Sequence, residues 1–201
     1  MSASSGSTDM GARAGGRRVS MVALAGVFAA TMAVSSWVSI PIPVSPVPLT
    51  LQTLAVLVTG GLLGRVWGPV SVAVYLLVGV AGIPVFAGGE AGIGVLLGFK
   101  GGYLLGFVVA AFVMGVAGDA SRARALRRRS SAGALGAGAV LGSLAIYALG
   151  VPWLAVVTGM GIRPALVAGM LPYVALDAVK AAAAVVLVRG VDEALGAQGL
   201  R

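Results

Sequence analysis

The sequence contains no cysteine and no histidine, and only 10% of its 201 residues are charged. Without these two side chains the chain has no disulfide, no thiolate nucleophile and no histidine ligand for a metal, and it lacks the commonest general base. A soluble domain carries about 25% charged residues, whereas 59% of this chain is hydrophobic. One small soluble core cannot hide so much apolar surface, so the composition indicates a protein whose solvent is lipid.

Stretches without charge indicate where the membrane helices lie. Three long stretches contain no charged residue, at 19–64, 66–89 and 130–162. A membrane helix needs about 20 apolar residues to cross about 30 Å of hydrocarbon, so the first stretch is long enough for two crossings. We therefore predict an all-α integral membrane protein of about six transmembrane helices. The predicted spans are residues 19–40, 49–64, 66–82, 102–118, 132–151 and 165–189.

Both ends of the chain are predicted to lie in the cytoplasm. An even number of spans puts them on one side. With the ends inside, Lys100 and Arg163 are the only basic residues in outer segments, and the other arginines lie in inner segments. This arrangement follows the positive-inside rule. The net charge of +8 therefore reflects topology, and we predict no nucleic-acid partner. The predicted divisions are a disordered tail at 1–18, a six-helix membrane domain at 19–190 and a cytoplasmic C-terminal tail at 191–201.

Two predicted outer loops have unusual composition. In the first, Pro41 to Pro48, four of the eight residues are proline, which excludes a helix and indicates a stiff extended strap. The second, from Gly82 to Gly102, is rich in glycine, which lets backbone approach a ligand closely. Irregular backbone near membrane depth is tolerated where it is buried in protein or lines a cavity.

Asp177 and Lys180 lie well inside the last apolar span. Ionisable residues inside a membrane are costly and mark functional sites by default. A spacing of three residues places both side chains on one face of a helix. Two interpretations are open, a site for a polar ligand and a structural ion pair that only neutralises itself.

The glycine-rich loop carries Glu90 and Lys100. A solvated loop charge is the ordinary interpretation of either residue. Lys100 has the stronger functional interpretation because glycines and Tyr103 surround it in the sequence.

The first span carries Ala25, Ala29 and Ala33 at a spacing of four residues. Small residues at this spacing let two helices approach closely. The face they form either packs inside the chain or meets a partner subunit.

Three segments resemble the BioY family. The first runs from Pro41 to Gln52, and the second begins Gly82-Ile-Pro-Val-Phe-Ala-Gly-Gly and continues to Gly101-Gly-Tyr-Leu-Leu-Gly-Phe107. The third is Leu171-Pro-Tyr with Asp177-Ala-Val-Lys180. The resemblance covers about residues 19 to 190. One departure is Gly98-Phe-Lys-Gly-Gly-Tyr103, where this family often has Gly-Pro-Thr-Gly-Gly-Tyr.

BioY proteins are the biotin-binding S components of energy-coupling-factor (ECF) transporters. The resemblance implies six helices in a prokaryotic plasma membrane and a biotin site that opens outward. It implies partners, namely a transmembrane coupling subunit and two ATPase subunits. Separately, from the residue types present, we predict no cofactor and no metal site in the chain itself. The resemblance also implies that the face of Ala25, Ala29 and Ala33 meets the coupling subunit.

The predicted site follows from the chemistry of biotin. Its ureido group offers N–H donors beside a carbonyl acceptor, which Asp177 and Lys180 can bind together. The carboxylate of biotin lies at the far end of its aliphatic chain, out of reach of Asp177 and Lys180 when these bind the ureido group. Lys100 is therefore the candidate to hold the carboxylate. An apolar pocket with few polar groups suits the ring and chain. The further predicted binding residues are Tyr103, Thr50, Gln52, Phe86, Gly88 and Gly89.

Three alternative functions make different demands on the sequence. An S component for another vitamin would keep the fold and change the ligand. An intramembrane enzyme would need a nucleophile with a base, or a metal, and one buried carboxylate does not supply them. A non-catalytic membrane scaffold would have no reason to bury Asp177 and Lys180. The sequence contains no phosphate-binding loop, so we expect no catalysis and no ATP hydrolysis by the chain itself.

Overall fold

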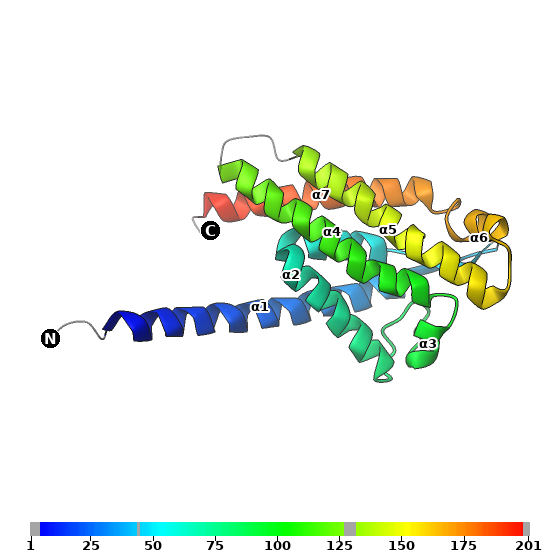
Figure 1. The fold of residues 1–201 in the computed structure, drawn as a ribbon, viewed down its shortest axis with the longest axis horizontal. Coiled ribbons are helices and arrows are strands. Elements are labelled where there is room, and N and C mark those ends of the chain that lie inside the picture. The colour runs from blue at the N-terminus through cyan, green and yellow to red at the C-terminus, as the bar shows by residue number, and fades with distance from the viewer. Residues whose placement is uncertain (1–4, 44, 127–131, 199–201) are drawn as a thin grey trace.

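The computed structural model describes residues 5–43, 45–126 and 132–198. Seven helices and two short strands make up this part of the chain (Figure 1). They are α1 (Ser5–Trp37), β1 (Ser39–Ile42), β2 (Ser45–Thr50), α2 (Gln52–Val80), α3 (Ile93–Leu97), α4 (Gly101–Leu126), α5 (Ala132–Thr158), α6 (Ile162–Gly169) and α7 (Val174–Ala197). Helix α4 lies between α2 and α5 and packs against both along its length.

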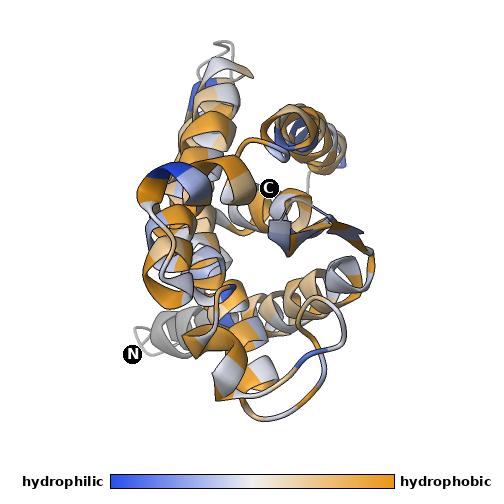
Figure 2. Cartoon of the chain, turned by 90° about the vertical axis from the view of Figure 1, so that its right-hand side faces the viewer, coloured by the Kyte–Doolittle hydropathy of each residue, from blue (hydrophilic) through white to orange (hydrophobic). Residues whose placement is uncertain are grey.

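The long helices are apolar enough to cross a membrane. Within the described ranges four helices are long and apolar enough to cross a membrane, and the number is five if the bent pair α6–α7 counts as one span. Hydrophobic residues predominate along them (Figure 2), and many large ones are exposed, including Val66, Leu77 and Val156. The chain is therefore a mostly helical, multi-pass membrane protein, whereas the predicted count of six helices stays a prediction.

Two of the predicted spans, 49–64 and 66–82, correspond to the two halves of the single element α2, which begins at Gln52 and ends at Val80. At Gly64 the backbone takes φ 80°, a left-handed conformation that interrupts the helix. A Cβ on Gly68 would lie 2.9 Å from Gly60 Cα, although eight residues of straight helix span about 12 Å. The two halves of α2 therefore turn sharply about Gly64 and meet beside it.

Charged residues, most of them basic, gather at this turn. Two arginines, Arg18 and Arg65, line one hollow next to Gly64 together with Asp119. The Arg122 guanidinium pairs with Asp119 at 2.7 Å and donates to the Gly61 carbonyl at 2.8 Å, so it satisfies a carbonyl that the interrupted helix leaves unpaired. In Figure 1 helix α7 ends on the left side of the bundle, and α1 begins on the same side, with its first turns projecting beyond the other helices.

The proline-rich segment is extended, as predicted, but it forms a β-hairpin. Strands β1 and β2 pair antiparallel, with Ser39 opposite Thr50 and Ile42 opposite Ser45. The prolines are tolerated because each strand has only one partner and the register is irregular between Ile40 and Ile42. The all-α prediction is therefore wrong in this short segment, because alternating prolines suit an edge strand.

The last predicted span, 165–189, is broken. Helices α6 and α7 meet at an angle of 53°, and the break contains Leu171, Pro172 and Tyr173. Proline lacks the N–H that a continuous helix needs and clashes with the preceding turn. The break places the start of α7, with Asp177, inside the protein.

Helix α1 differs from its prediction at both ends. It begins at Ser5, within the segment predicted as a disordered tail at 1–18, and it ends at Trp37, before the predicted limit of 40. The divisions at 1–18, 19–190 and 191–201 stay predictions, and residues 1–4 and 199–201 lie outside the described part of the chain.

The alanine face of α1 packs inside the chain. Ala25 and Ala29 are only 2% and 6% exposed, and the Ala25 carbonyl accepts a hydrogen bond from Ser71 of α2 at 2.8 Å. Ala33 packs against the same core. Of the two interpretations left open by the sequence, these contacts favour internal packing, because α2 covers the face that a partner subunit would need.

Ala29→Leu should therefore lower the stability of the purified chain, by about 1–2 kcal/mol, because added methyl groups overpack a filled interface. The matched control is Gly26→Leu on the exposed side of α1, where a Cβ meets no atom within 4 Å. The control should keep or slightly raise stability, since leucine favours helix more than glycine. Thermal unfolding in detergent measures both. Equal stability of both variants would restore the partner-surface interpretation of Ala29.

Candidate functional site

One pocket gathers side chains from nearly every part of the bundle. It lies between β2, the start of α2, the loop before α3, the start of α4, α5 and the bent pair α6–α7. Its lining residues are Val47, Pro48, Thr50, Gln52, Thr53, Phe86, Ala87, Val95, Lys100, Tyr103, Leu104, Phe107, Ile146, Tyr147, Gly169, Tyr173, Asp177 and Lys180. Apolar and aromatic side chains supply most of the wall, with a few polar groups among them, as is usual for a small-molecule site.

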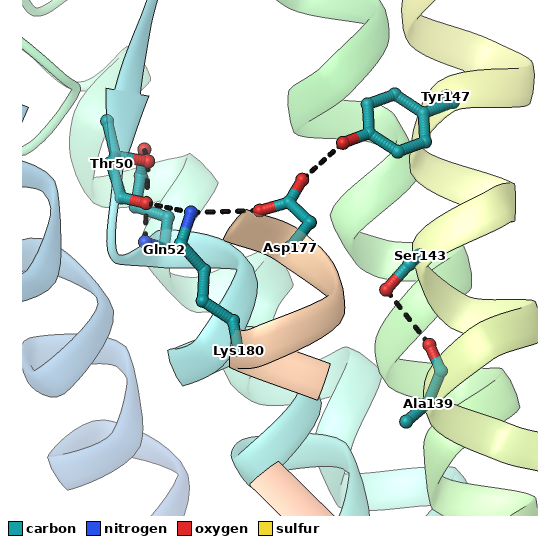
Figure 3. A network of polar contacts seen from close by, with 7 residues as sticks. All are labelled: Thr50, Gln52, Ala139, Ser143, Tyr147, Asp177 and Lys180. Atoms are coloured by element: carbon teal, nitrogen blue, oxygen red, sulfur yellow. Dashed lines mark hydrogen bonds and ion pairs between the residues drawn. The ribbon is translucent and has the colours of Figure 1, made fainter. Parts of the chain in front are cut away.

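Asp177 and Lys180 form a buried ion pair at this pocket. The Lys180 ammonium lies 2.8 Å from Asp177 Oδ1, and the two residues are 8% and 7% exposed. The Tyr147 hydroxyl of α5 donates to the other carboxylate oxygen of Asp177 (Figure 3). Both oxygens of the carboxylate thus have donors, so the pair is held in a fixed position.

Two hydrogen bonds join the hairpin to α7 and to the residue just before it. Lys180 donates to the Thr50 carbonyl at 2.6 Å (Figure 3), and the Tyr173 hydroxyl donates to the Val47 carbonyl. Strand β2 therefore lies against the ion pair, and Lys180 binds both the strand and Asp177. A group that binds to Lys180 would act on the hairpin as well.

Thr50 and Gln52 belong to a second polar chain beside this pair. The Thr50 hydroxyl lies 3.3 Å from Gln52 Oε1, and Gln52 Nε2 donates to the Tyr75 hydroxyl at 2.6 Å. Tyr75 in turn donates to the Val85 carbonyl at 3.1 Å. The chain links β2 to the start of the glycine-rich loop, and its members Thr50 and Gln52 border the pocket.

Lys100 lies on the loop side of the same pocket. Its ammonium donates to the Ala87 carbonyl at 3.0 Å and pairs with Glu90 at 2.8 Å. The Lys100 side chain is only 12% exposed, whereas that of Glu90 is 47% exposed. The pocket thus has two separate cationic groups, Lys180 and Lys100, contributed by α7 and by the loop.

Two predicted aromatic residues line the pocket. Phe86 is fully buried and packs edge-on against Tyr75. The Tyr103 hydroxyl donates to the Gly169 carbonyl of α6 at 2.9 Å. Both side chains are thereby fixed by contacts to other elements.

Gly88 and Gly89 are placed differently from the prediction, since neither borders the pocket. Both have positive φ, 85° and 73°, and they form the turn that lets the Phe86 N–H reach the Glu90 carbonyl at 3.1 Å. Their role is to shape the loop, because only glycine adopts this backbone readily.

Several lining residues escaped the sequence analysis, notably Tyr147, Tyr173, Phe107 and Ile146. A signal existed for Tyr147, because a hydroxyl in an apolar span requires a partner. Ile146 gave none, since it resembles any apolar residue of a membrane helix, and the one signal for Phe107 was its place at the end of a segment that resembles the BioY family. Only helix packing assigns them to the pocket.

Within the described ranges no group of three acidic side chains lies close enough to hold a metal ion. The polar groups of the pocket are a carboxylate, two ammonium groups, hydroxyls and one amide. This set can bind a small molecule that carries both donors and acceptors.

Comparison with known proteins places the chain among transport proteins. The model of the BioY family matches residues 7–197. The chain is 41% identical over 156 residues to the biotin transporter BioY of Thermotoga maritima, covering 78% of this chain and 86% of that protein. It is 38% identical over 171 residues to the probable biotin transporter BioY of Pyrococcus horikoshii, covering 85% and 93%.

A solved structure has the same fold. The crystal structure of the S-component for biotin from an ECF-type ABC transporter superposes with a TM-score of 0.78 at 26% identity, covering 89% of this chain and 93% of that one.

Proposed function

Since the chain belongs to the BioY family, we propose that it is the biotin-binding S component of an ECF transporter. The relatives named above are biotin transporters, and the fold matches an S-component for biotin. The chain would hold biotin in the membrane, and partner subunits, a transmembrane coupling protein and two ATPases, would supply the energy. Its own residues would bind and orient the substrate and would catalyse no reaction of it.

The observation that carries this proposal is the buried pair of Asp177 and Lys180 at the pocket. The ureido group of biotin has two N–H donors and one carbonyl acceptor. Asp177 would accept from an N–H and Lys180 would donate to the carbonyl, so one helix turn would bind both ends of the group. Charge-assisted hydrogen bonds of this kind are about twice as strong as neutral ones.

The remaining walls suit the rest of the molecule. The thioether ring and aliphatic chain of biotin are apolar, and Phe86, Phe107 and Ile146 offer apolar surface beside the ion pair. Burial of this surface would supply about 25 cal/mol per Å². Lys100 lies on the loop side of the pocket and would hold the carboxylate at the end of the chain.

The charge distribution supports an orientation in the cell membrane. Arg18, Arg65 and Arg122 lie together at one end, whereas Lys100 belongs to the loop beside the pocket. By the positive-inside rule the arginine end would face the cytoplasm. The pocket would then open toward the outside, as an importer requires, and the adjoining lipid would contact the exposed apolar helix faces.

Mass spectrometry of the ligand retained by the gently purified chain tests the proposal. We expect biotin to be the retained molecule. Retention of a different vitamin would keep the transporter class and overturn biotin as the substrate. Retention of neither, with no biotin binding on addition, would overturn the proposal itself.

Lys100→Met should selectively weaken binding of ligands with a carboxylate. The parent chain should prefer biotin over its neutral amide, and the variant should lose most of that preference. The expected size is about 1 kcal/mol, because Lys100 already pairs with the half-exposed Glu90 and a new carboxylate gains only the difference between two weak pairs. Competition of both ligands against labelled biotin measures it. Loss of the preference in Lys180→Met, with Lys100→Met unchanged, would mean that biotin lies the other way round.

A further inference from the structure

Glu90 already forms an ion pair with the lysine that we assign to the ligand carboxylate. Its Oε1 lies 2.8 Å from the Lys100 ammonium. The Glu90 carboxylate thus makes the same contact with the Lys100 ammonium that we propose for the carboxylate of the ligand. The inference below rests on the proposed function, because it concerns how a carboxylate ligand reaches Lys100.

Lys100 lies at the boundary between two spaces. On one side it borders the pocket that contains Asp177 and Lys180. On the other side it borders an outer hollow, which Glu90 and Phe99 also line. Glu90 does not border the inner pocket. The lysine is therefore approached by Glu90 from the outer hollow and is open to a ligand from the inner pocket.

The backbone holds Glu90 in place while its side chain stays partly free. The Phe86 N–H donates to the Glu90 carbonyl at 3.1 Å, and the Phe86 ring is fully buried. Gly88 and Gly89 complete the turn between them with positive φ. The Glu90 side chain is 47% exposed, so its carboxylate can leave Lys100 for water at small cost.

We propose that Glu90 is an internal competitor for Lys100, which a ligand carboxylate replaces when it binds. Two carboxylates beside one ammonium repel each other. The Ala87 carbonyl already takes one donor of that ammonium. A carboxylate ligand must therefore displace Glu90 or accept its repulsion, whereas a neutral ligand meets neither cost. Glu90 thus lowers the affinity for carboxylate ligands and sets the preference between charged and neutral ones.

Exchange of this kind also has a consequence for the loop. The Glu90–Lys100 pair joins the turn at 86–90 to the start of α4. A ligand that takes over Lys100 releases this link on the outer side of the pocket. The hydrogen bond from Lys100 to the Ala87 carbonyl still joins the same turn to Lys100, so the loop loses one of its two links.

Glu90→Gln tests the proposal, because glutamine keeps the size and the hydrogen bond but removes the charge. We expect the variant to bind biotin about two- to fivefold more tightly, in keeping with the small energies of half-exposed pairs. Binding of the neutral amide should not change. The matched control is Glu193→Gln, which removes a carboxylate 71% exposed on α7 and paired with Arg189. It should leave both affinities unchanged.

Repeating the substitution in a Lys100→Met background separates competition from simple repulsion. Competition predicts that the gain for biotin shrinks, because there is no ammonium to release. An equal gain in both backgrounds would overturn the competition and leave only repulsion through space.

The outcomes also separate this proposal from the proposed function. If the parent chain binds biotin and Glu90→Gln binds it equally or less tightly, the competition is wrong and the transporter assignment stands. If the parent chain binds no biotin, the proposed function fails, and with it this inference.

Discussion

Lys180→Met is expected to weaken biotin binding by about 2–3 kcal/mol, roughly 30- to 150-fold in Kd. The ammonium bridges the Asp177 carboxylate and the Thr50 carbonyl at 2.8 and 2.6 Å. Its removal leaves Asp177 with one neutral donor, Tyr147, and takes away the donor for the ureido carbonyl. Titration of the purified chain with biotin and with its amide measures the loss. Both ligands should lose equally, because both carry the ureido group.

The control for this substitution is Arg189→Met on the same helix. Arg189 is half exposed and pairs with Glu193 at 3.3 Å, and it does not border the pocket. This variant loses the same charge from α7 and should bind biotin normally. A Lys180→Met chain that unfolds more easily but binds biotin as the parent does would show that the pair is structural only.

Asp177→Asn, alone and combined with Lys180→Met, extends the test of the ion pair by biotin titration. If the two residues act on one ureido group, the double variant should lose less than the sum of the two single losses, because each single change leaves the other group unpaired. Additive losses would indicate that the two residues serve separate parts of the ligand.

Gly150→Ala is expected to destabilise the chain by about 3 kcal/mol, at the upper end for overpacking. A Cβ at this position of α5 would lie 2.3 Å from the Tyr103 ring. Tyr103 cannot easily retreat, since its hydroxyl donates to the Gly169 carbonyl and a Cβ on Gly169 would lie 2.2 Å from that hydroxyl. The ring fills the space that these two glycines provide. A shift of Tyr103 would also change the pocket wall, so biotin binding should fall with stability.

Gly136→Ala is the matched change on the same helix. A Cβ there meets no atom within 4 Å, so alanine should be neutral or add up to about 1 kcal/mol through helix propensity. Thermal unfolding of both variants in detergent gives the comparison. Equal melting temperatures would show that α5 and Tyr103 are packed less tightly than described.

The sequence identified the ion pair and the membrane class, because both depend on rules that act locally. Asp177 and Lys180 stand out as charges in an apolar span, and their spacing on one helix face requires no tertiary information. The long charge-free stretches likewise indicate membrane helices directly. The grouping of Lys100, Thr50 and Gln52 around the pair is predicted from the chemistry of biotin, the ligand that the family resemblance implies.

Other features depend on packing that the sequence does not display. Tyr147 meets Asp177 only because α5 lies beside α7. The Ala29 face could pack in either of two ways, and burial against α2 distinguishes them. The alternating prolines predict that the hairpin segment is extended, but they do not predict that its two halves pair, since pairing depends on where the chain turns. The apolar pattern continues through Pro172 and therefore does not indicate the break there.

Calorimetric titration of the purified chain in lipid nanodiscs, without nucleotide or partner subunits, gives the most direct result. We expect saturable binding of one biotin per chain, and a strong loss of that binding in Lys180→Met with none in Arg189→Met. Absence of biotin binding by the parent chain, or undiminished binding by Lys180→Met, would contradict the assignment of the Asp177–Lys180 pair as the centre of a biotin site.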